Sequence, residues 1–210
     1  MRVSRRAFIV GAGAAASGSV VPVSRSFAES EIKEYRLAAK LAVVNLTGNG
    51  HPDTAVWAYD GTVPGSEIRV RQGERIRVVV SNKLGEDTTV HWHGIRLPNA
   101  MDGVPGLTQK PIRAGDSFIY EFTPPDAGTF WYHPHADTLQ QLGRGLAGVL
   151  IVEEREPVAV DRDILWFIED WRLDDRGRIA HGFGNRMEAG MSGRIGNTVT
   201  VNGRFPNAYP

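Results

Sequence analysis

Two pairs of histidines in this 210-residue chain are spaced so that both members of each pair could bind one metal ion. His91 and His93 lie in the stretch HWHG, and His133 and His135 lie in FWYHPHA. Side chains at positions i and i+2 of a β-strand project from the same face, so each pair would present two imidazoles on one side. Imidazole is a good ligand for copper, zinc, nickel and iron. The first hypothesis is therefore a metal site.

A single His-x-His pair also has an ordinary explanation, as two surface histidines or two hydrogen-bonded histidines in a core. The chain has six histidines, however, and four of them fall in two such pairs, each beside a tryptophan. We therefore expect these four to bind metal together. His51 and His181 stand in turn-like segments and are predicted to lie in surface loops. Met187 and Met191 have thioether groups that suit Cu(I), but we expect them to serve in a loop or in packing.

The elements that must position these histidines are predicted to be β-strands. Short apolar or alternating runs at 34–44, 54–61, 88–95 and 145–154 are separated by Gly- and Pro-rich turns. Residues 67–84 alternate on either side of QGE, which predicts a half-buried hairpin, and residues 116–135 predict two aromatic-rich strands. The pattern contains no convincing long amphipathic helix. It predicts an all-β domain, a Greek-key sandwich or barrel, over residues 29–154.

A second β domain is predicted to begin after this one. Residues 155–163 carry a proline and several charges and are interpreted as a linker. Strands are expected at 164–173 and 197–205, the second running into an Asn-Gly turn. Residues 155–210 are too few to complete a second sandwich, so we interpret this part as an incomplete second domain.

The N-terminus resembles an export signal. Arg5 and Arg6 precede an apolar run that extends from Ala7 to about Val23, and small residues precede Glu29. The run is short and rich in Gly, Ala and Ser, which disfavours a membrane anchor. We expect residues 1–28 to be a twin-arginine signal peptide, cleaved to release a periplasmic protein without a membrane anchor.

Composition excludes several classes of function. Without the four arginines of residues 1–28, 20 basic residues stand against 24 acidic ones, so nothing suggests a nucleic-acid partner. The chain has no cysteine, which excludes disulfides, thiolate metal sites and cysteine nucleophiles in these 210 residues.

Several motifs occur together in a recognisable order: HWHG, DGVPGLTQKPI, GTFWYHPH and GLAGVLIV. In this order the sequence resembles the first cupredoxin domain of the multicopper oxidases, the family of laccases and cuprous oxidases. The resemblance runs from about residue 35 to 154, and the residues to 210 resemble the opening of the second domain. It implies a cupredoxin-like fold and half of the ligands of a trinuclear copper cluster.

The resemblance also implies individual roles. His91 would bind the type 2 copper, His93 and His133 one type 3 copper, and His135 the other. Asp102 occupies the position of a carboxylate that the family uses to deliver protons to reduced oxygen. The alternative for Asp102 is an aspartate that caps the Asp-Gly turn.

The resemblance is incomplete, because the family's type 1 copper needs a cysteine and the cluster needs eight histidines. Two explanations remain open: the chain is part of a longer oxidase that oxidises phenols, Cu(I) or other metal ions with O₂, or it is a short product that keeps half a cluster. In either case we expect the chain alone to be inactive as an oxidase. Two non-catalytic alternatives are a copper-binding module and a structural or cell-division protein of the same superfamily.

Overall fold

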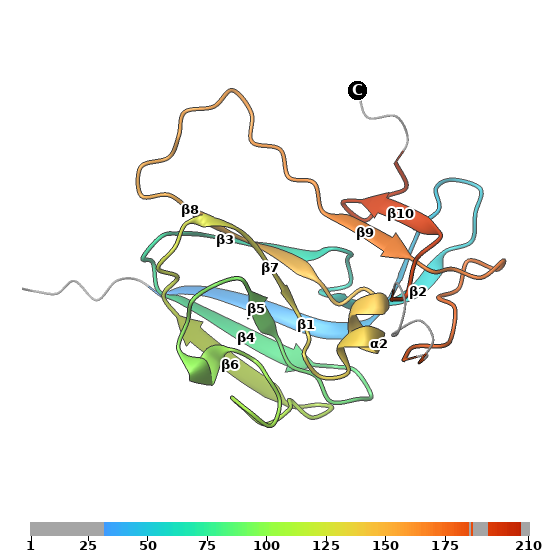
Figure 1. Ribbon diagram of the computed structural model, residues 1–210, viewed down its shortest axis with the longest axis horizontal. Helices are drawn as coiled ribbons and strands as arrows, with labels where there is room; N and C mark the ends of the chain where they lie inside the picture. Colours follow the sequence, from blue (N-terminus) through green and yellow to red (C-terminus); the bar gives the residue numbers. More distant parts are fainter. Residues whose placement is uncertain (1–31, 185, 187–192, 207–210) are drawn as a thin grey trace, which may run out of the picture.

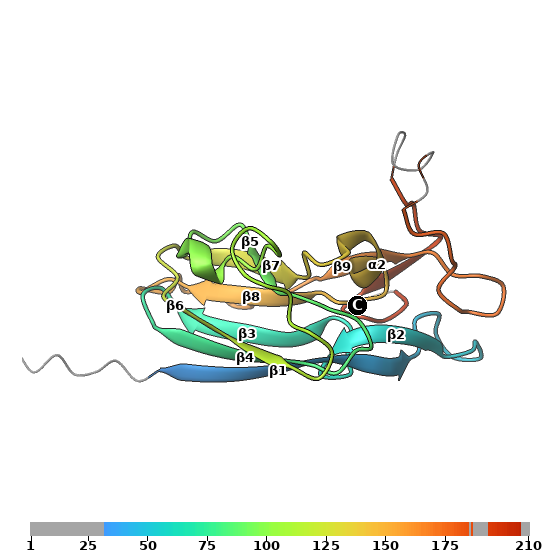
Figure 2. The same cartoon turned by 90° about the horizontal axis from the view of Figure 1, so that it is seen from below.

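The computed structural model describes residues 32–184, 186 and 193–206, so the predicted signal peptide and both methionines at 187 and 191 lie outside the described residues. The first 120 or so of these residues form a sandwich of two four-stranded sheets, seen edge-on in Figure 2. One sheet has the order β2-β1-β4-β6 and the other the order β3-β8-β7-β5. The bounds are β1 Lys33–Val44, β2 Thr54–Tyr59, β3 Gly65–Arg71, β4 Ile76–Asn82, β5 His91–His93, β6 Ser117–Phe122, β7 Gly128–His133 and β8 Gly148–Glu153. The all-β prediction is confirmed.

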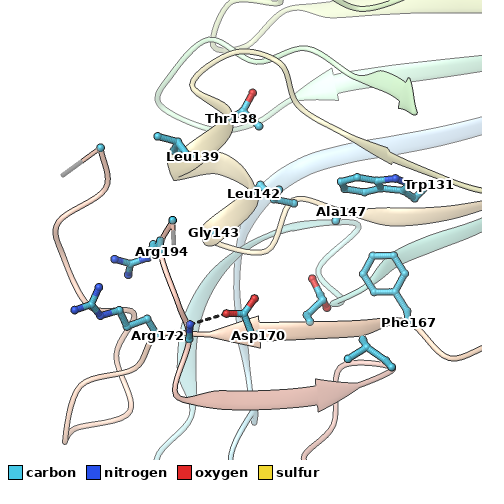
Figure 3. A pocket seen from close by; sticks show the side chains of 15 residues that line it. Trp131, Thr138, Leu139, Leu142, Gly143, Ala147, Phe167, Asp170, Arg172 and Arg194 are labelled. Carbon is cyan, nitrogen blue, oxygen red and sulfur yellow. Dashed lines mark hydrogen bonds between the residues drawn. The ribbon is translucent and has the colours of Figure 1, made fainter. Parts of the chain in front are cut away.

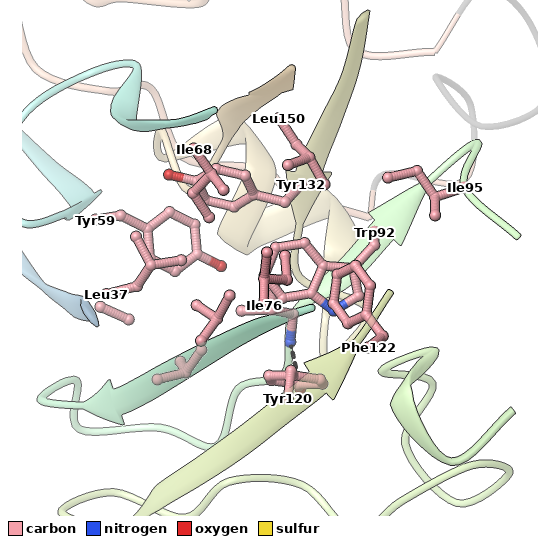
Figure 4. Packing of buried hydrophobic residues seen from close by; sticks show 14 of the residues in the cluster. Leu37, Tyr59, Ile68, Ile76, Trp92, Ile95, Tyr120, Phe122, Tyr132 and Leu150 are labelled. Carbon is pink, nitrogen blue, oxygen red and sulfur yellow. Dashed lines mark hydrogen bonds between the residues drawn. The ribbon is translucent and has the colours of Figure 1, made fainter. Parts of the chain in front are cut away.

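Alternation along the strands builds the core between the two sheets. Ile76, Val78 and Val80 of β4 are completely buried, whereas the residues between them are only partly covered. The opposite sheet contributes Trp92 of β5 and Tyr132 of β7, which are also completely buried. Figure 4 shows these aromatic rings meeting others from the facing sheet, including Tyr120 and Phe122 of β6. Burying such large rings contributes several kcal/mol in total and fixes where each strand lies.

The hairpin predicted over residues 67–84 is wrong. β3 and β4 are both present, but β3 pairs with β8 and β4 pairs with β1 and β6, so the two strands belong to opposite sheets. The turn at Gly73, where φ is +87°, therefore carries the chain from one sheet to the other. An alternating pattern specifies which face of a strand is buried. It does not specify the sheet, because a strand in either sheet of the sandwich can satisfy the same pattern.

Beyond β8 the chain has no helix or strand until β9 (Ile168–Trp171), so the predicted linker is irregular in structure. β9 pairs antiparallel with β10 (Thr198–Val201). Each strand lies within its predicted range of 164–173 or 197–205, but both are shorter than predicted. The Asn-Gly turn follows, with positive φ at Asn202 and Gly203. Figure 1 shows this pair beside β2 and the short helix α2 (Thr138–Gly143).

A second, smaller apolar cluster joins the β9–β10 pair to the sandwich. Trp171, Leu173 and Ile179 pack against Val56 and Val63, and all five are buried. The Trp171 indole N–H donates a hydrogen bond to Thr200 Oγ1 at 2.9 Å. None of the helices in the described part of the chain is long and apolar enough to cross a membrane.

Candidate metal centre

The pairing of β5 with β7 brings the two histidine pairs together. Their antiparallel register sets His91 directly opposite His133 and His93 opposite Trp131. Directly opposed residues project from the same face of a sheet with their Cβ atoms about 5 Å apart. The His91 and His133 ring centroids accordingly lie 5.5 Å apart. Two motifs distant in sequence therefore form one cluster.

The core determines which way the histidines point. Trp92 and Tyr132 are opposite each other in the same register, and both face inward. Their neighbours on each strand must therefore face away from the core. The Val90 N–H, just before β5, donates to the buried Tyr120 hydroxyl at 3.0 Å and fixes the start of this three-residue edge strand.

Three imidazoles converge closely enough to share a metal ion. One ring nitrogen from each of His91, His93 and His133 lies within 4.8 Å of the others. His93 Nδ1 and His133 Nε2 are 3.3 Å apart. His135 does not belong to this group of three, although its ring centroid lies 4.5 Å from that of His91. The structure thus gathers all four predicted residues in one place, three of them tightly.

Burial keeps the inner imidazole neutral. His133 is only 4% exposed, and this burial, with a smaller contribution from the nearby His91, lowers its pKa to about 4. Partial desolvation, with a smaller contribution from His91, also lowers the pKa of His135. A neutral imidazole has the free lone pair that a metal ion requires, so these two side chains are in the ligating form at neutral pH.

Backbone carbonyls select the tautomer of two of the rings. His91 Nδ1–H donates to the Asp102 carbonyl oxygen at 2.7 Å, and His133 Nδ1–H donates to the Pro134 carbonyl oxygen at 3.0 Å. A carbonyl can only accept, so the proton must be on Nδ1 and the lone pair on Nε2. Such bonds from the second ring nitrogen orient metal-binding histidines.

Asp102 contacts His91 through its side chain as well. Its Oδ1 lies 3.3 Å from His91 Nδ1, and the carboxylate is half-buried. The contact depends on the following residue: Gly103 has φ +78°, and a Cβ there would lie 1.8 Å from the Val90 carbonyl oxygen. Only glycine allows the Asp-Gly turn to approach β5 this closely. The structure therefore places the Asp102 carboxylate beside His91.

A buried polar network that sequence reasoning missed supports His135. Thr89 Oγ1 accepts the His135 backbone N–H at 3.1 Å. Next to it, Thr88 Oγ1 donates to Gln141 Oε1 at 2.7 Å, and Gln141 Nε2 donates to the Asp87 carbonyl oxygen at 2.7 Å. Gln141 is 1% exposed and lies on α2. In the sequence, Gln141 is simply a glutamine in a short segment, and this does not predict that its side chain is buried.

Trp131 and the two remaining histidines lie outside the group of three ligating nitrogens. Trp131 stacks on His133 with ring centroids 4.1 Å apart, so it packs on the cluster. His51 and His181 are exposed in loops, as predicted.

Comparison with known proteins gives the family. Residues 40–157 match the family model described as multicopper oxidase. The chain is 34% identical over 186 residues to copper resistance protein A of Escherichia coli, covering 81% of this chain and 29% of that protein. It is 40% identical over 122 residues to the multicopper oxidase MmcO of Mycobacterium tuberculosis, covering 58% of this chain and 24% of that protein.

Solved structures of multicopper oxidases resemble this chain in both sequence and fold. The crystal structure of a multi-copper oxidase from Pseudomonas thermotolerans is 44% identical with a TM-score of 0.75, covering 83% of this chain and 42% of that one. A second, from Pseudomonas parafulva, is 45% identical with the same TM-score, covering 81% of this chain and 41% of that one. The fold is cupredoxin-like, and its candidate site is a cluster of imidazole side chains. The chain belongs to the multicopper oxidase family, and it spans less than a third of the length of the curated relatives named above.

Proposed function

We propose that this chain forms the N-terminal part of a periplasmic multicopper oxidase and supplies half of the ligands of its trinuclear copper cluster. The observation that carries the proposal is the convergence of His91, His93 and His133, whose nitrogens lie within 4.8 Å of one another. The whole enzyme would couple one-electron oxidation of a reducing substrate to reduction of O₂ to water.

The residues present fit copper. All the donors are imidazoles, the inner one is held neutral by burial, and two rings have their Nε2 lone pairs directed away from carbonyl partners. Nitrogen donors of this kind suit copper, whose role when bound is to accept and pass on single electrons. Zinc and nickel share the preference for imidazole, so the family supports copper specifically.

Each histidine takes the role that the family resemblance implies. His91 would bind the type 2 copper, His93 and His133 one type 3 copper, and His135 the other. His93 and His135 are exposed on the side of the cluster that faces away from the core. This open side would accept the four histidines that the rest of the oxidase must contribute.

Asp102 would pass protons at this cluster. Its carboxylate is half-buried, 3.3 Å from His91 Nδ1, and positioned to accept or donate a proton through nearby water. Replacing it by asparagine keeps the shape of the side chain and removes the proton carrier. We expect Asp102→Asn to leave the copper content of the full-length oxidase unchanged and to slow O₂ reduction more than tenfold.

The electron-entry site would come from another part of the protein, since these 210 residues include no cysteine. The reducing substrate is a phenol, Cu(I) or another metal ion. The name copper resistance protein A favours a role connected with copper. Export through the twin-arginine pair at Arg5 and Arg6 would deliver the protein to the periplasm.

Elemental analysis tests the metal site. We expect His91→Ala combined with His133→Ala to abolish copper binding by the full-length protein. The matched control is His51→Ala combined with His181→Ala, two exposed histidines outside the cluster. Unchanged copper in the first double variant would refute the assignment.

A second candidate is a copper-binding module without turnover, which the absence of cysteine from these 210 residues would permit. O₂ uptake with a reducing substrate distinguishes the two, because only an oxidase consumes O₂ in proportion to the substrate oxidised. We expect the 210-residue chain alone to give no such uptake.

A further inference from the structure

Trp131 completes a square of four rings on the face of β5 and β7 that points away from the core. The strand register sets His91 opposite His133 and His93 opposite Trp131. Opposed residues, and residues two positions apart on one strand, project from the same face of a sheet. Trp131 therefore occupies the fourth corner beside the three histidines whose nitrogens converge.

The indole of Trp131 contacts histidines rather than the core. Its ring centroid lies 4.1 Å from that of His133 with the planes 25° apart. It lies 4.8 Å from that of His93 with the planes 32° apart. Trp131 belongs to neither apolar cluster of the described chain, and it is not among the side chains packed against them. Core packing therefore does not explain why an indole stands at this position.

The surroundings of Trp131 are open enough for its role to be tested by substitution. The side chain is half-buried and forms part of the wall of a cavity of about 500 Å³. Figure 3 shows it there with Leu142, Ala147 and Phe167, and Glu169 lines the same cavity. Substitutions of side chains outside the core usually change stability little. We therefore expect variants at Trp131 to fold, so that their effect on the histidines can be measured.

His93 is the histidine that most needs support from a neighbouring ring. Backbone carbonyls orient the rings of His91 and His133, but His93 is exposed and has no such partner among the described residues. The one hydrogen-bonding contact of its side chain there joins His93 Nδ1 to His133 Nε2 at 3.3 Å. This contact is lost as soon as either nitrogen binds a metal ion. The stack against Trp131 then remains to hold the ring.

We propose that Trp131 is a positioning residue for the metal site, and that its indole holds the His93 and His133 rings in the orientation in which their nitrogens converge. The proposal rests on the proposed function, in which these two histidines bind one copper. Aromatic rings in stacked or tilted contact attract each other beyond simple apolar burial. A side chain that is already held in place loses less conformational entropy when a ligand binds. Residues that orient metal ligands commonly contribute about 10- to 100-fold to metal affinity.

Nuclear magnetic relaxation of the histidine rings tests the proposal in the metal-free 210-residue chain, with isotope-labelled histidine. In Trp131→Leu we expect the order parameter of the His93 ring to fall below about 0.6, the range of flexible groups. Trp131→Phe keeps a ring at this position and should keep His93 ordered. His91, whose ring is held by the Asp102 carbonyl, should be unchanged in both variants. A His93 ring as ordered in Trp131→Leu as in the parent chain would overturn the proposal.

Calorimetric titration with Zn²⁺, which binds imidazole and has no redox chemistry, gives a second readout. Trp131→Leu should bind Zn²⁺ about tenfold more weakly than the parent chain, and Trp131→Phe within about threefold of it. Phe167→Leu removes a ring from the wall of the same cavity and is the matched control, with parental affinity expected. Circular dichroism checks that each variant is folded.

The outcomes separate positioning from simple packing. If Trp131→Leu lowers stability but leaves both His93 order and Zn²⁺ affinity unchanged, Trp131 has a packing role only and the proposal fails. If the parent chain binds no Zn²⁺, the proposed metal site is in error, and the relaxation measurement, which needs no metal, still decides whether Trp131 orders His93.

Discussion

Glu169 makes the stability of this chain depend on pH in a direction unusual for a carboxylate. Burial raises its pKa from 4.5 to about 8. The folded carboxyl therefore keeps its proton up to about pH 8, whereas the unfolded chain loses it near pH 4.5. Since the folded state binds more protons in this window, the free energy of unfolding must fall as the pH rises from 4.5 to 8, and level off above it.

The change Glu169→Gln removes the titration and keeps the size of the side chain. Each pKa unit corresponds to about 1.4 kcal/mol, so the shift is equivalent to about 5 kcal/mol at most. Water that enters the open cavity reduces this, and we expect a difference of about 2–5 kcal/mol. Relative to the parent chain, Glu169→Gln should gain this stability progressively between about pH 4.5 and about pH 8.

The measurement is urea denaturation of the 210-residue parent and variant across this pH range, followed by tryptophan fluorescence and by circular dichroism. Other groups titrate in the same window, including His133, so the informative quantity is the difference between variant and parent. Glu121→Gln is the control, because a hydrogen bond from Arg77 lowers the pKa of Glu121 below 4.5, so the difference between this variant and the parent should stay constant between pH 4.5 and 8. A difference between Glu169→Gln and parent that does not change with pH would refute the reasoning.

Two further predictions concern residues that hold the histidine cluster in place. Gly103→Ala should lower the free energy of unfolding by more than about 2 kcal/mol and weaken copper loading, because the new Cβ would collide with the Val90 carbonyl. Gly106→Ala, at a similar φ of +77° with nothing within 4 Å, is its control and should lose only about 1 kcal/mol and keep its copper. Gln141→Leu should cost about 2–3 kcal/mol, since Thr88 and the Asp87 carbonyl lose buried hydrogen bonds; denaturant titration that shows no loss would contradict this role.

The strands and the histidine cluster were largely predictable because both depend on a period of two residues. Alternation predicted that His91 and His93 share one face of a strand before any pairing was known. The partner of each strand was not predictable in the same way, as the error over β3 and β4 shows. Pairing is decided by contacts between residues far apart in sequence, and the period is the same whichever sheet the strand joins.

Other parts of the site depend on groups that a sequence pattern does not display. The carbonyl oxygens of Asp102 and Pro134 fix two histidine tautomers, yet every residue has a carbonyl. The Asp-Gly pair is visible in the sequence, but the sequence does not show how closely this turn approaches the Val90 carbonyl. Glu169 stands in an apolar run and was predicted simply as part of a strand, because alternation does not reveal whether a cavity lies beside a side chain.

The geometry of β5 explains how so short a strand can hold two histidines of the cluster in place. Three residues at the edge of a sheet form few ladder hydrogen bonds, so pairing with β7 alone would define its position weakly. Trp92 compensates for the small number of hydrogen bonds by anchoring the strand in the core, because its ring is completely buried among Tyr120, Phe122 and Tyr132. The tryptophan between the two histidines therefore fixes both of them at once, and any movement of its ring in the core must move His91 and His93 together.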